Sequence, residues 1–231
     1  MRIIVFILLI VASLISFSQQ YDFGSWNVIT TKLKLSSKWG LFHELQLRSL
    51  SFYRHHYYYE AKVGASYSLN KNFSFLLGVG KYMTYSDGGN FEQPVTANES
   101  RLWEQVTMNQ SLLRVNIEHR YRMEQRWFKN GYRNRFRYRL SSTAPLNHKK
   151  IVPETFYVTV FDEIFLNNET PYFERNRFFA GIGYQISKQF SVQPGFLRQY
   201  DYKNNTGFGK NYFLLLFSID IDAEKNSAKN N

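Results

Sequence analysis

The chain has no cysteine, and among its 231 residues there are only 5 Pro and 13 Gly. The absence of Cys excludes a disulfide scaffold, thiolate metal ligands and a cysteine nucleophile. Beyond the N-terminus no apolar run approaches the ~20 residues of a membrane-spanning helix, which excludes a helical membrane protein. What the chain has instead is 17 Tyr, 21 Phe, and 29 Lys and Arg against 18 Asp and Glu. So many aromatic side chains exclude a disordered, charge-dominated chain.

The N-terminus predicts export. Arg2 supplies a positive start, an apolar stretch follows from Ile3 to Ile15, and Ser16 and Ser18 place small residues before a cleavage point. This pattern predicts a signal peptide over residues 1–18 and a mature domain over 19–231; the alternative is an uncleaved N-terminal anchor. Cleavage leaves 28 basic and 18 acidic residues, a net charge of +10. An exported basic protein has no expected nucleic-acid partner, so the charge points to anionic lipids, sugars or solutes.

The mature chain alternates with a period of two residues, which is typical of β-strands that have one apolar face. Between residues 113 and 126 the apolar positions are 113, 115, 117, 121 and 123, with His119 among them, and the intervening positions are mostly charged. Residues 132–140 repeat the pattern, with Arg at every second position from Arg133 to Arg139. Each segment therefore has an apolar side and a strongly charged side.

About eleven segments of this kind follow one another, and they predict an antiparallel, up-and-down transmembrane β-barrel of about 10–12 strands. Long connections are expected at 86–98, 167–175 and 203–210, on the rim opposite the tight turns. Because bacterial barrels have an even strand number and the first segment is the weakest, ten or twelve strands are expected. A polar tail covers 222–231, and Phe217 is a candidate signal for the barrel-assembly machinery. The eleven segments are 24–35, 41–53, 57–69, 73–85, 99–109, 112–126, 132–142, 154–166, 176–187, 190–202 and 211–221.

A soluble β-sandwich, or a lipocalin-like binding barrel in the periplasm, would also alternate. Two observations favour the membrane. All the segments offer an apolar side, more than one short core needs, and the opposite sides concentrate Arg more heavily than an open surface does. The predicted location is the outer membrane of a Gram-negative cell, with outer-membrane lipids and lipopolysaccharide as partners.

The charged faces predict a basic interior buffered by carboxylates. Arg pairs with carboxylates in a planar, bidentate manner, so one interpretation is a salt-bridge network that fills and rigidifies the barrel. The other is a porin-like passive channel for small anionic solutes, because rings of positive charge select anions. The residues expected to line the lumen and to bind anions are Arg114, Glu118, Arg120, Arg122, Glu124, Arg126, Arg133, Arg135, Arg137, Arg139, Glu163 and Arg177.

No catalytic centre, cofactor or metal site is predicted, so we do not expect an enzyme. None of the five His has a Ser two residues later, as in outer-membrane lipid hydrolases that use Ser and His. Glu118 and Glu124 are six residues apart on one face, about 20 Å along a strand, which is too far for a glycosidase pair. A lipid-modifying enzyme of the outer membrane remains the alternative from another functional class.

The charged core also resembles a known family. The run from Arg120 to Arg126 (RYRMEQR), followed by Arg135 to Arg139 (RFRYR), is similar to the core of an uncharacterised bacterial outer-membrane family, domain of unknown function 2490. The resemblance covers nearly all of the mature chain, and it implies a signal peptide, an outer-membrane barrel and no assigned activity. Weaker matching pieces are Trp26, Glu44 to Arg48, Glu99 to Trp103, Asp162 to Phe165, and Arg175 to Tyr184.

Overall fold

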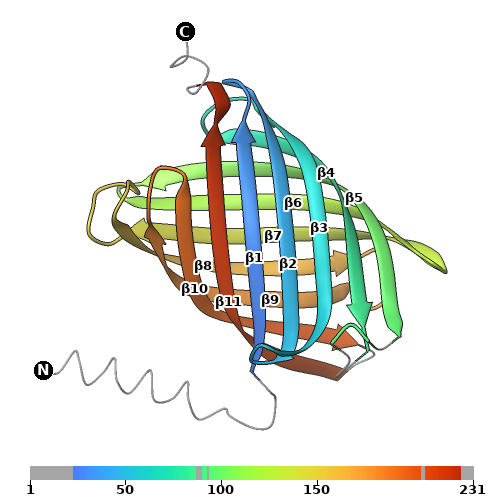
Figure 1. Ribbon diagram of the computed structural model, residues 1–231. Helices are drawn as coiled ribbons and strands as arrows, with labels where there is room; N and C mark the ends of the chain where they lie inside the picture. The colour runs from blue at the N-terminus through green and yellow to red at the C-terminus, as the bar shows by residue number, and fades with distance from the viewer. Residues whose placement is uncertain (1–22, 87–89, 93, 204–205, 225–231) are drawn as a thin grey trace, which may run out of the picture.

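Eleven strands form one closed barrel in a computed structural model of the protein, which describes residues 23–86, 90–92, 94–203 and 206–224 (Figure 1). The predicted signal peptide and residues 225–231 of the predicted polar tail lie outside the described residues. Among the residues that are described there is no helix long and apolar enough to cross a membrane. The strands are β1 (Gly24–Lys34), β2 (Trp39–Ser51), β3 (Arg54–Ser68), β4 (Phe73–Tyr85), β5 (Val95–Leu112), β6 (Val115–Phe128), β7 (Gly131–Pro145), β8 (Thr155–Asn167), β9 (Phe173–Gln185), β10 (Phe190–Lys203) and β11 (Thr206–Asp222).

The predicted all-β barrel is therefore confirmed, and each predicted segment corresponds to one strand. The expected even number of strands is wrong, because eleven strands close in the described part of the chain. Consecutive strands pair antiparallel, whereas β1 pairs in parallel with β11 from Gly24 opposite Tyr212 to Lys34 opposite Asp222. An odd number of strands requires this parallel closure, and the first segment, weakest in the sequence, supplies it.

The parallel closure places the two ends of the barrel domain at opposite rims (Figure 1). We call the end where β1 begins the N-terminal rim and the end where β11 finishes the C-terminal rim. The expected division into a rim of tight turns and a rim of long connections is wrong. Each rim carries one long connection, 86–94 at the N-terminal rim and 146–154 at the C-terminal rim, and these two have the same length. The long connection expected at 203–210 is also wrong: β10 and β11 stay paired as far as Lys203 opposite Thr206.

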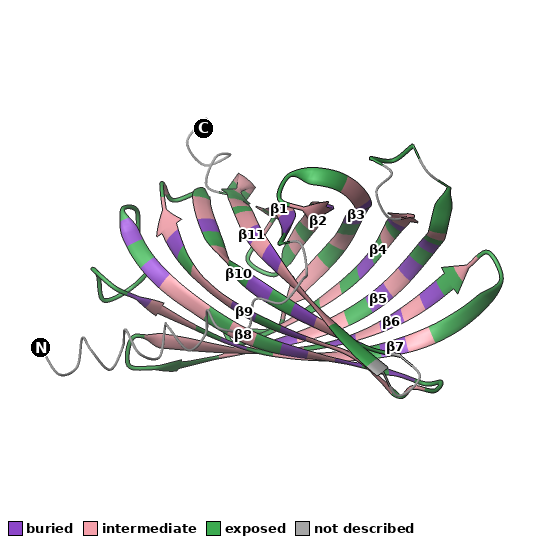
Figure 2. Cartoon of the chain, turned by 90° about the horizontal axis from the view of Figure 1, so that it is seen from below, coloured by how far each residue is buried: buried purple, intermediate pink, exposed green. Residues whose placement is uncertain are grey.

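Side chains alternate between the inside and the outside of the barrel along each strand, and buried and exposed residues therefore alternate in Figure 2. Large apolar side chains are exposed on the outside of all eleven strands; Val63, Leu77 and Ile182, for example, are 52%, 54% and 57% exposed. The buried residues between them include Arg, Lys and Glu side chains. The barrel is thus apolar outside and charged inside, which is the reverse of a soluble protein.

One part of the interior departs from this rule. β1, β9, β10 and β11 place apolar side chains inward, and these form a cluster along that wall. Both faces of β11 are apolar, because Leu214 is buried inside while Phe217 is exposed outside. The cluster comprises Trp26, Val28, Phe179, Leu197, Tyr212 and Leu214, with Phe161 and Leu216 packed against it. The charged residues therefore occupy the remaining interior, mainly along β2–β7 and the ends of β8–β10.

Candidate functional site

The charged interior is organised around the pairing of β6 with β7. These strands are neighbours, as expected for an up-and-down barrel, and their register sets Arg122 directly opposite Arg137 and Arg120 opposite Arg139. Like charges opposite one another destabilise a sheet unless other groups neutralise them. Carboxylates supplied by this strand pair and by neighbouring strands provide that neutralisation.

Glu124 is the centre of the network. Its side chain is fully buried, and its carboxylate accepts hydrogen bonds from Nε and Nη2 of Arg135 at 3.0 and 2.5 Å and from Nη1 of Arg137 at 2.6 Å. Arg101 and Arg122 lie further away, at 3.6 and 3.8 Å. One carboxylate is therefore shared by four guanidinium groups, three of them on neighbouring strands.

Other carboxylates extend the network around the interior. Glu163 on β8 accepts from Arg120 at 2.6 Å and from Arg137 at 2.8 Å. Glu99 on β5 pairs with Arg101 at 2.7 Å and with Arg126 at 3.1 Å. On the opposite wall, the buried Lys62 lies between Glu44 and Glu60. Because most of these carboxylates are shared between strands, the network ties the walls of the barrel together.

Aromatic side chains stack against the guanidinium groups. The Phe165 ring is fully buried, and Arg137 and Arg177 approach its centroid to 4.5 and 4.6 Å. Trp103, also fully buried, lies under Arg122 at 4.1 Å. Such cation–π contacts are worth about 0.5–2 kcal/mol each when desolvated. The aromatic rings fill space between the charges and leave little room for water at the waist of the barrel.

A cavity lies on each side of the waist in the described part of the barrel. The N-terminal cavity has a volume of about 170 Å³ and is lined by residues toward the N-terminal rim, including Arg48, Arg101 and Arg177. The C-terminal cavity, of about 470 Å³, includes Lys32 and Arg139 and lies toward the other rim. The two cavities have no lining residue in common. We call the layer between them the septum and define it by Glu44, Lys62, Trp103, Arg122, Glu124, Arg137 and Glu163.

The structure brings ten of the twelve predicted lumen residues together inside the barrel. Glu118 and Arg139 pair at 2.6 Å near the C-terminal rim, and the other eight take part in the network or line a cavity. Two predictions are corrected. Arg114 lies exposed in the turn after β5, where the strand pattern has already ended. Arg133 lies near the start of β7, exposed, and its partner at 3.7 Å is Glu169 in a rim connection.

Several interior residues were not among those predicted. Arg48, Lys62 and Arg101 alternate correctly within their strands, and weaker contrast between the faces of those strands hid them. Glu174 could not be found by alternation, because a bulge opposite Phe165 and Leu166 shifts the register there. The bulge turns Glu174 inward beside its neighbour Arg175; Glu174 then pairs with Arg135 at 2.9 Å and Arg126 at 3.3 Å, and Arg175 pairs with Asp201.

Histidine and acidic residues form no metal centre in the described part of the chain, where no group of three or more potential ligands is present. His119 lies beside Tyr138, with Nδ1 and the hydroxyl 2.8 Å apart, and His148 lies beside Thr155 at 3.0 Å. Neither contact joins a His to a Ser.

Comparison of the chain with protein-family models matches residues 23–210 to the family described as Protein of unknown function (DUF2490). No curated protein and no solved structure gave a significant match. The match runs from the residue before β1 into the first part of β11.

Proposed function

Because the chain belongs to the DUF2490 family, whose function is unknown, we propose its role from its own geometry: a barrel of the outer membrane whose interior is closed by the septum. In this role it is a structural and solute-binding protein rather than an open channel. The observation that carries the proposal is the inversion of polarity, with apolar side chains exposed around the whole barrel and paired charges buried within it.

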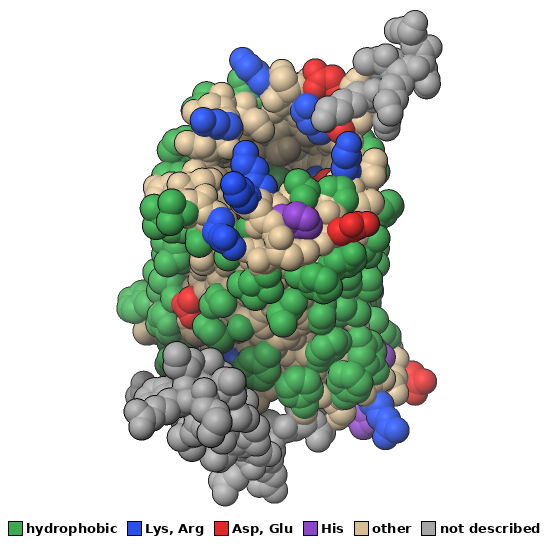
Figure 3. Space-filling model, turned by 90° about the vertical axis from the view of Figure 1, so that its left-hand side faces the viewer, with side chains coloured by type: hydrophobic (Ala, Val, Ile, Leu, Met, Phe, Trp, Pro, Cys, Tyr) green, Lys and Arg blue, Asp and Glu red, His purple; other side chains and the backbone are tan. Residues whose placement is uncertain are grey.

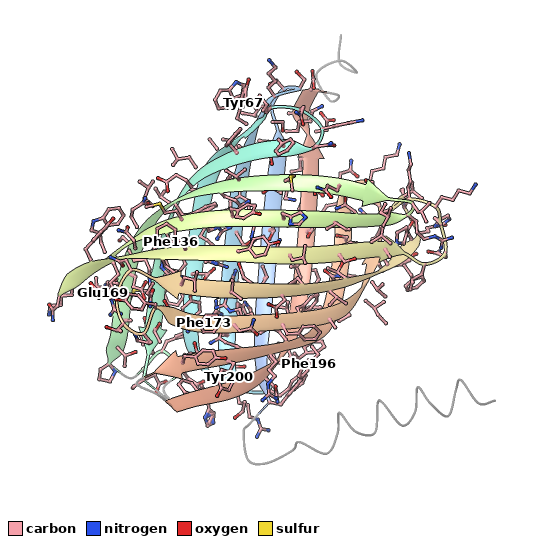
Figure 4. The ribbon with its side chains drawn as sticks, turned by 180° about the vertical axis from the view of Figure 1, so that it is seen from behind. Tyr67, Phe136, Glu169, Phe173, Phe196 and Tyr200 are labelled. Atoms are coloured by element: carbon pink, nitrogen blue, oxygen red, sulfur yellow. The ribbon has the colours of Figure 1, made fainter. Side chains whose placement is uncertain are left out.

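The exterior has the dimensions and chemistry of a lipid-facing surface. The shortest strand, β1, has 11 residues; tilted by about 45°, a strand of that length advances roughly 25 Å, the height of the apolar band in outer-membrane barrels. Monomeric soluble proteins rarely expose a continuous apolar surface of this extent. Side chains project outward along the strands in Figure 4, where Phe136 lies on β7 and Tyr67 at the C-terminal rim.

Aromatic pairs lie near both rims, where membrane interfaces accommodate amphipathic rings. Near the C-terminal rim the rings of Trp39 and Tyr67 are 4.9 Å apart. Near the N-terminal rim Phe173 and Tyr202 are 4.6 Å apart. These pairs support two interfacial belts separated by the apolar band.

The C-terminal rim carries a ring of positive charge that we call the basic crown. All five connections at this rim combine an exposed Lys or Arg with an exposed large apolar residue, and Lys and Arg surround a hollowed mouth there in Figure 3. At the N-terminal rim, the described parts of the connections contain Lys129 with Glu92 and Glu169. The crown consists of Lys38, Lys71, Arg114, Lys149, Lys150 and Lys188.

The crown supports contact with anionic lipid headgroups, lipopolysaccharide among them. A basic residue near an anionic membrane surface contributes about 1 kcal/mol, while apolar neighbours enter the acyl boundary. Leu113 is the extreme case. It is 98% exposed in the turn beside Arg114, and its φ of 55° is a strained conformation for a residue with a side chain. In water its apolar side chain would have no contact that compensates for this strain. A lipid environment gives this side chain an apolar contact.

Charged side chains also occur on the outside between the rims, and each of the two central acidic ones has an amide partner. Glu104 accepts from Gln125 at 3.1 Å, and Asp162 accepts from Asn176 at 2.9 Å. Acidic residues at the lipid face cost less than Lys or Arg at the same depth. Hydrogen bonds from the neighbouring strand lower that cost further, so the two positions are compatible with a lipid-facing surface.

The closed interior argues against passive flow. A channel needs a continuous wet path, and the septum separates two cavities that share no lining residue. Reconstitution in planar bilayers tests this directly: the wild-type barrel should give no discrete conductance steps. Regular, anion-selective steps would show instead that the interior opens and that the protein is a passive channel.

The location is tested separately. Extraction from outer membranes, followed by electrophoresis with and without heating, should give a band whose mobility changes on boiling. A protein found in the soluble periplasmic fraction would be the lipocalin-like binding barrel instead. Release of fatty acid from labelled phospholipid by the purified barrel would favour the lipid-modifying enzyme, the remaining alternative.

A further inference from the structure

The N-terminal cavity has an excess of positive charge. Eight Lys and Arg side chains line it, together with three Glu. Counting also the carboxylates that reach these cations from the surrounding wall, seven carboxylates face the eight cations. Two of the seven, Glu124 and Glu163, are shared with Arg122 and Arg120, outside the cavity. Unbalanced charge is costly in a poorly hydrated interior.

Arg177 is the cation left over. It is buried, and in the part of the chain that the structure describes its hydrogen-bond partner is neutral: Nε donates to Oε1 of Gln199 at 2.9 Å. Aromatic rings cover its guanidinium, with the centroids of Trp26 and Phe165 at 4.8 and 4.6 Å. Arg177 lines the cavity, and no ion pair joins it to a carboxylate of the described residues.

Arg48 brings a second guanidinium group to the cavity, on the same Trp26 ring as Arg177. Its guanidinium lies 3.5 Å from the centroid of the same Trp26 ring, and its Nε is buried without a hydrogen-bond partner among the described residues. That atom is enclosed by protein, and Arg48 nevertheless lines the cavity and adds its positive charge to the wall. Arg175, whose side chain is 21% exposed, lies on the rim side and brings a third guanidinium to the cavity.

The size of the cavity suits a small ligand. A volume of about 170 Å³ corresponds to roughly six waters at about 30 Å³ each, which is room enough for inorganic phosphate. Guanidinium forks match the oxygens of phosphate and carboxylate in a bidentate manner. The charge excess, the guanidinium groups at the wall and the cavity size all indicate a small oxyanion.

We propose that the N-terminal cavity is a binding site for a small oxyanion, a phosphate or a phosphomonoester, held by Arg177 and Arg48 with Arg175 at its entrance. The anion supplies the missing negative charge and accepts hydrogen bonds from the guanidinium groups that line the cavity. The proposal deepens the role assigned to the interior, and it holds whether or not the barrel lies in a membrane. Its failure and that of the membrane assignment are therefore separate results.

Calorimetric titration of the folded barrel in detergent micelles tests the site, with inorganic phosphate as the first probe and glycerol 3-phosphate as the second. The wild type should bind at least one of them, and the second titration distinguishes free phosphate from an ester headgroup. Arg177→Gln should weaken binding by roughly tenfold to a hundredfold, because hydrogen bonds to a charged group are lost. Arg133→Gln, which removes the same charge at the exposed rim, should bind as the wild type does.

A second readout separates the binding role from a structural one. Without phosphate, Arg177→Gln should unfold at a temperature no lower than that of the wild type, because it removes an unbalanced buried charge. Added phosphate should raise the unfolding temperature of the wild type more than that of Arg177→Gln at the same concentration. Arg177→Lys, which keeps the charge and loses the fork, should fold and bind phosphate more weakly than the wild type. Binding of neither probe by the wild type, or undiminished binding by Arg177→Gln, would overturn the proposal.

Discussion

Replacing Glu124 with Gln tests whether the septum holds the barrel together. Gln keeps the size of the side chain but loses the charge that four guanidinium groups share. Three hydrogen bonds of 2.5–3.0 Å end on this carboxylate; a hydrogen bond to a charged group contributes about 1.5–3 kcal/mol, and breaking a buried ion pair costs about 3–5 kcal/mol. We expect the free energy of unfolding to fall by about 3–5 kcal/mol, a large part of the 5–15 kcal/mol typical of a folded domain.

Urea unfolding in micelles, followed by the fluorescence of the 4 Trp, measures this loss. The matched control is Glu104→Gln, a carboxylate on the neighbouring strand whose side chain lies outside and bonds only to the Gln125 amide in the described structure. That change should alter the free energy of unfolding by less than about 1 kcal/mol. If Glu124→Gln unfolded within about 1 kcal/mol of the wild type, the septum would not be the stabilising element described here.

Three further predictions concern packing, lipid contact and assembly. Gly78→Ala should destabilise the barrel by about 1–3 kcal/mol in the same urea assay, since the added Cβ would lie 2.3 Å from an atom of the fully buried Trp103 ring. Lys149→Gln should lower the preference for spin-labelled anionic over neutral lipid by about 1 kcal/mol, roughly fivefold, whereas Lys129→Gln at the other rim should not. Phe217→Ala should reduce assembly into the outer membrane, measured as the heat-modifiable fraction; assembly equal to that of the wild type would exclude Phe217 as the assembly signal.

The strands that the sequence predicted best are those whose two faces differ most. Every second residue is charged from Glu118 to Arg126 in β6 and from Arg133 to Arg139 in β7, so a shift of one residue would put Arg on the outer surface and apolar side chains into the network. The placement of Glu124 and Arg135 on the inner face was therefore recoverable from spacing alone. The pairing of Glu163 with Arg120 was not, because it joins β8 to β6 across the intervening β7.

The predictions failed where the local sequence pattern does not determine which way a side chain points or which strands pair. β11 is apolar on both faces, so its sequence could not show that Tyr212 and Leu214 turn inward to form an apolar wall. The inward turn of Glu174 depends on a bulge, and one additional residue reverses the alternation. The odd strand number depends on the pairing of β1 with β11, whose residues are nearly two hundred positions apart in the chain.

The central claim is that apolar side chains face lipid and charges face an enclosed interior. Since the chain has no Cys, single Cys residues at Val63, at Ile182 and at the inward-facing Thr107 can each carry a fluorophore without background labelling. In vesicles that contain doxyl-labelled lipid, the probes at 63 and 182 should be strongly quenched and the probe at 107 should not. Equal, weak quenching at all three positions would contradict the account, because it would place the apolar surface of the barrel out of contact with lipid.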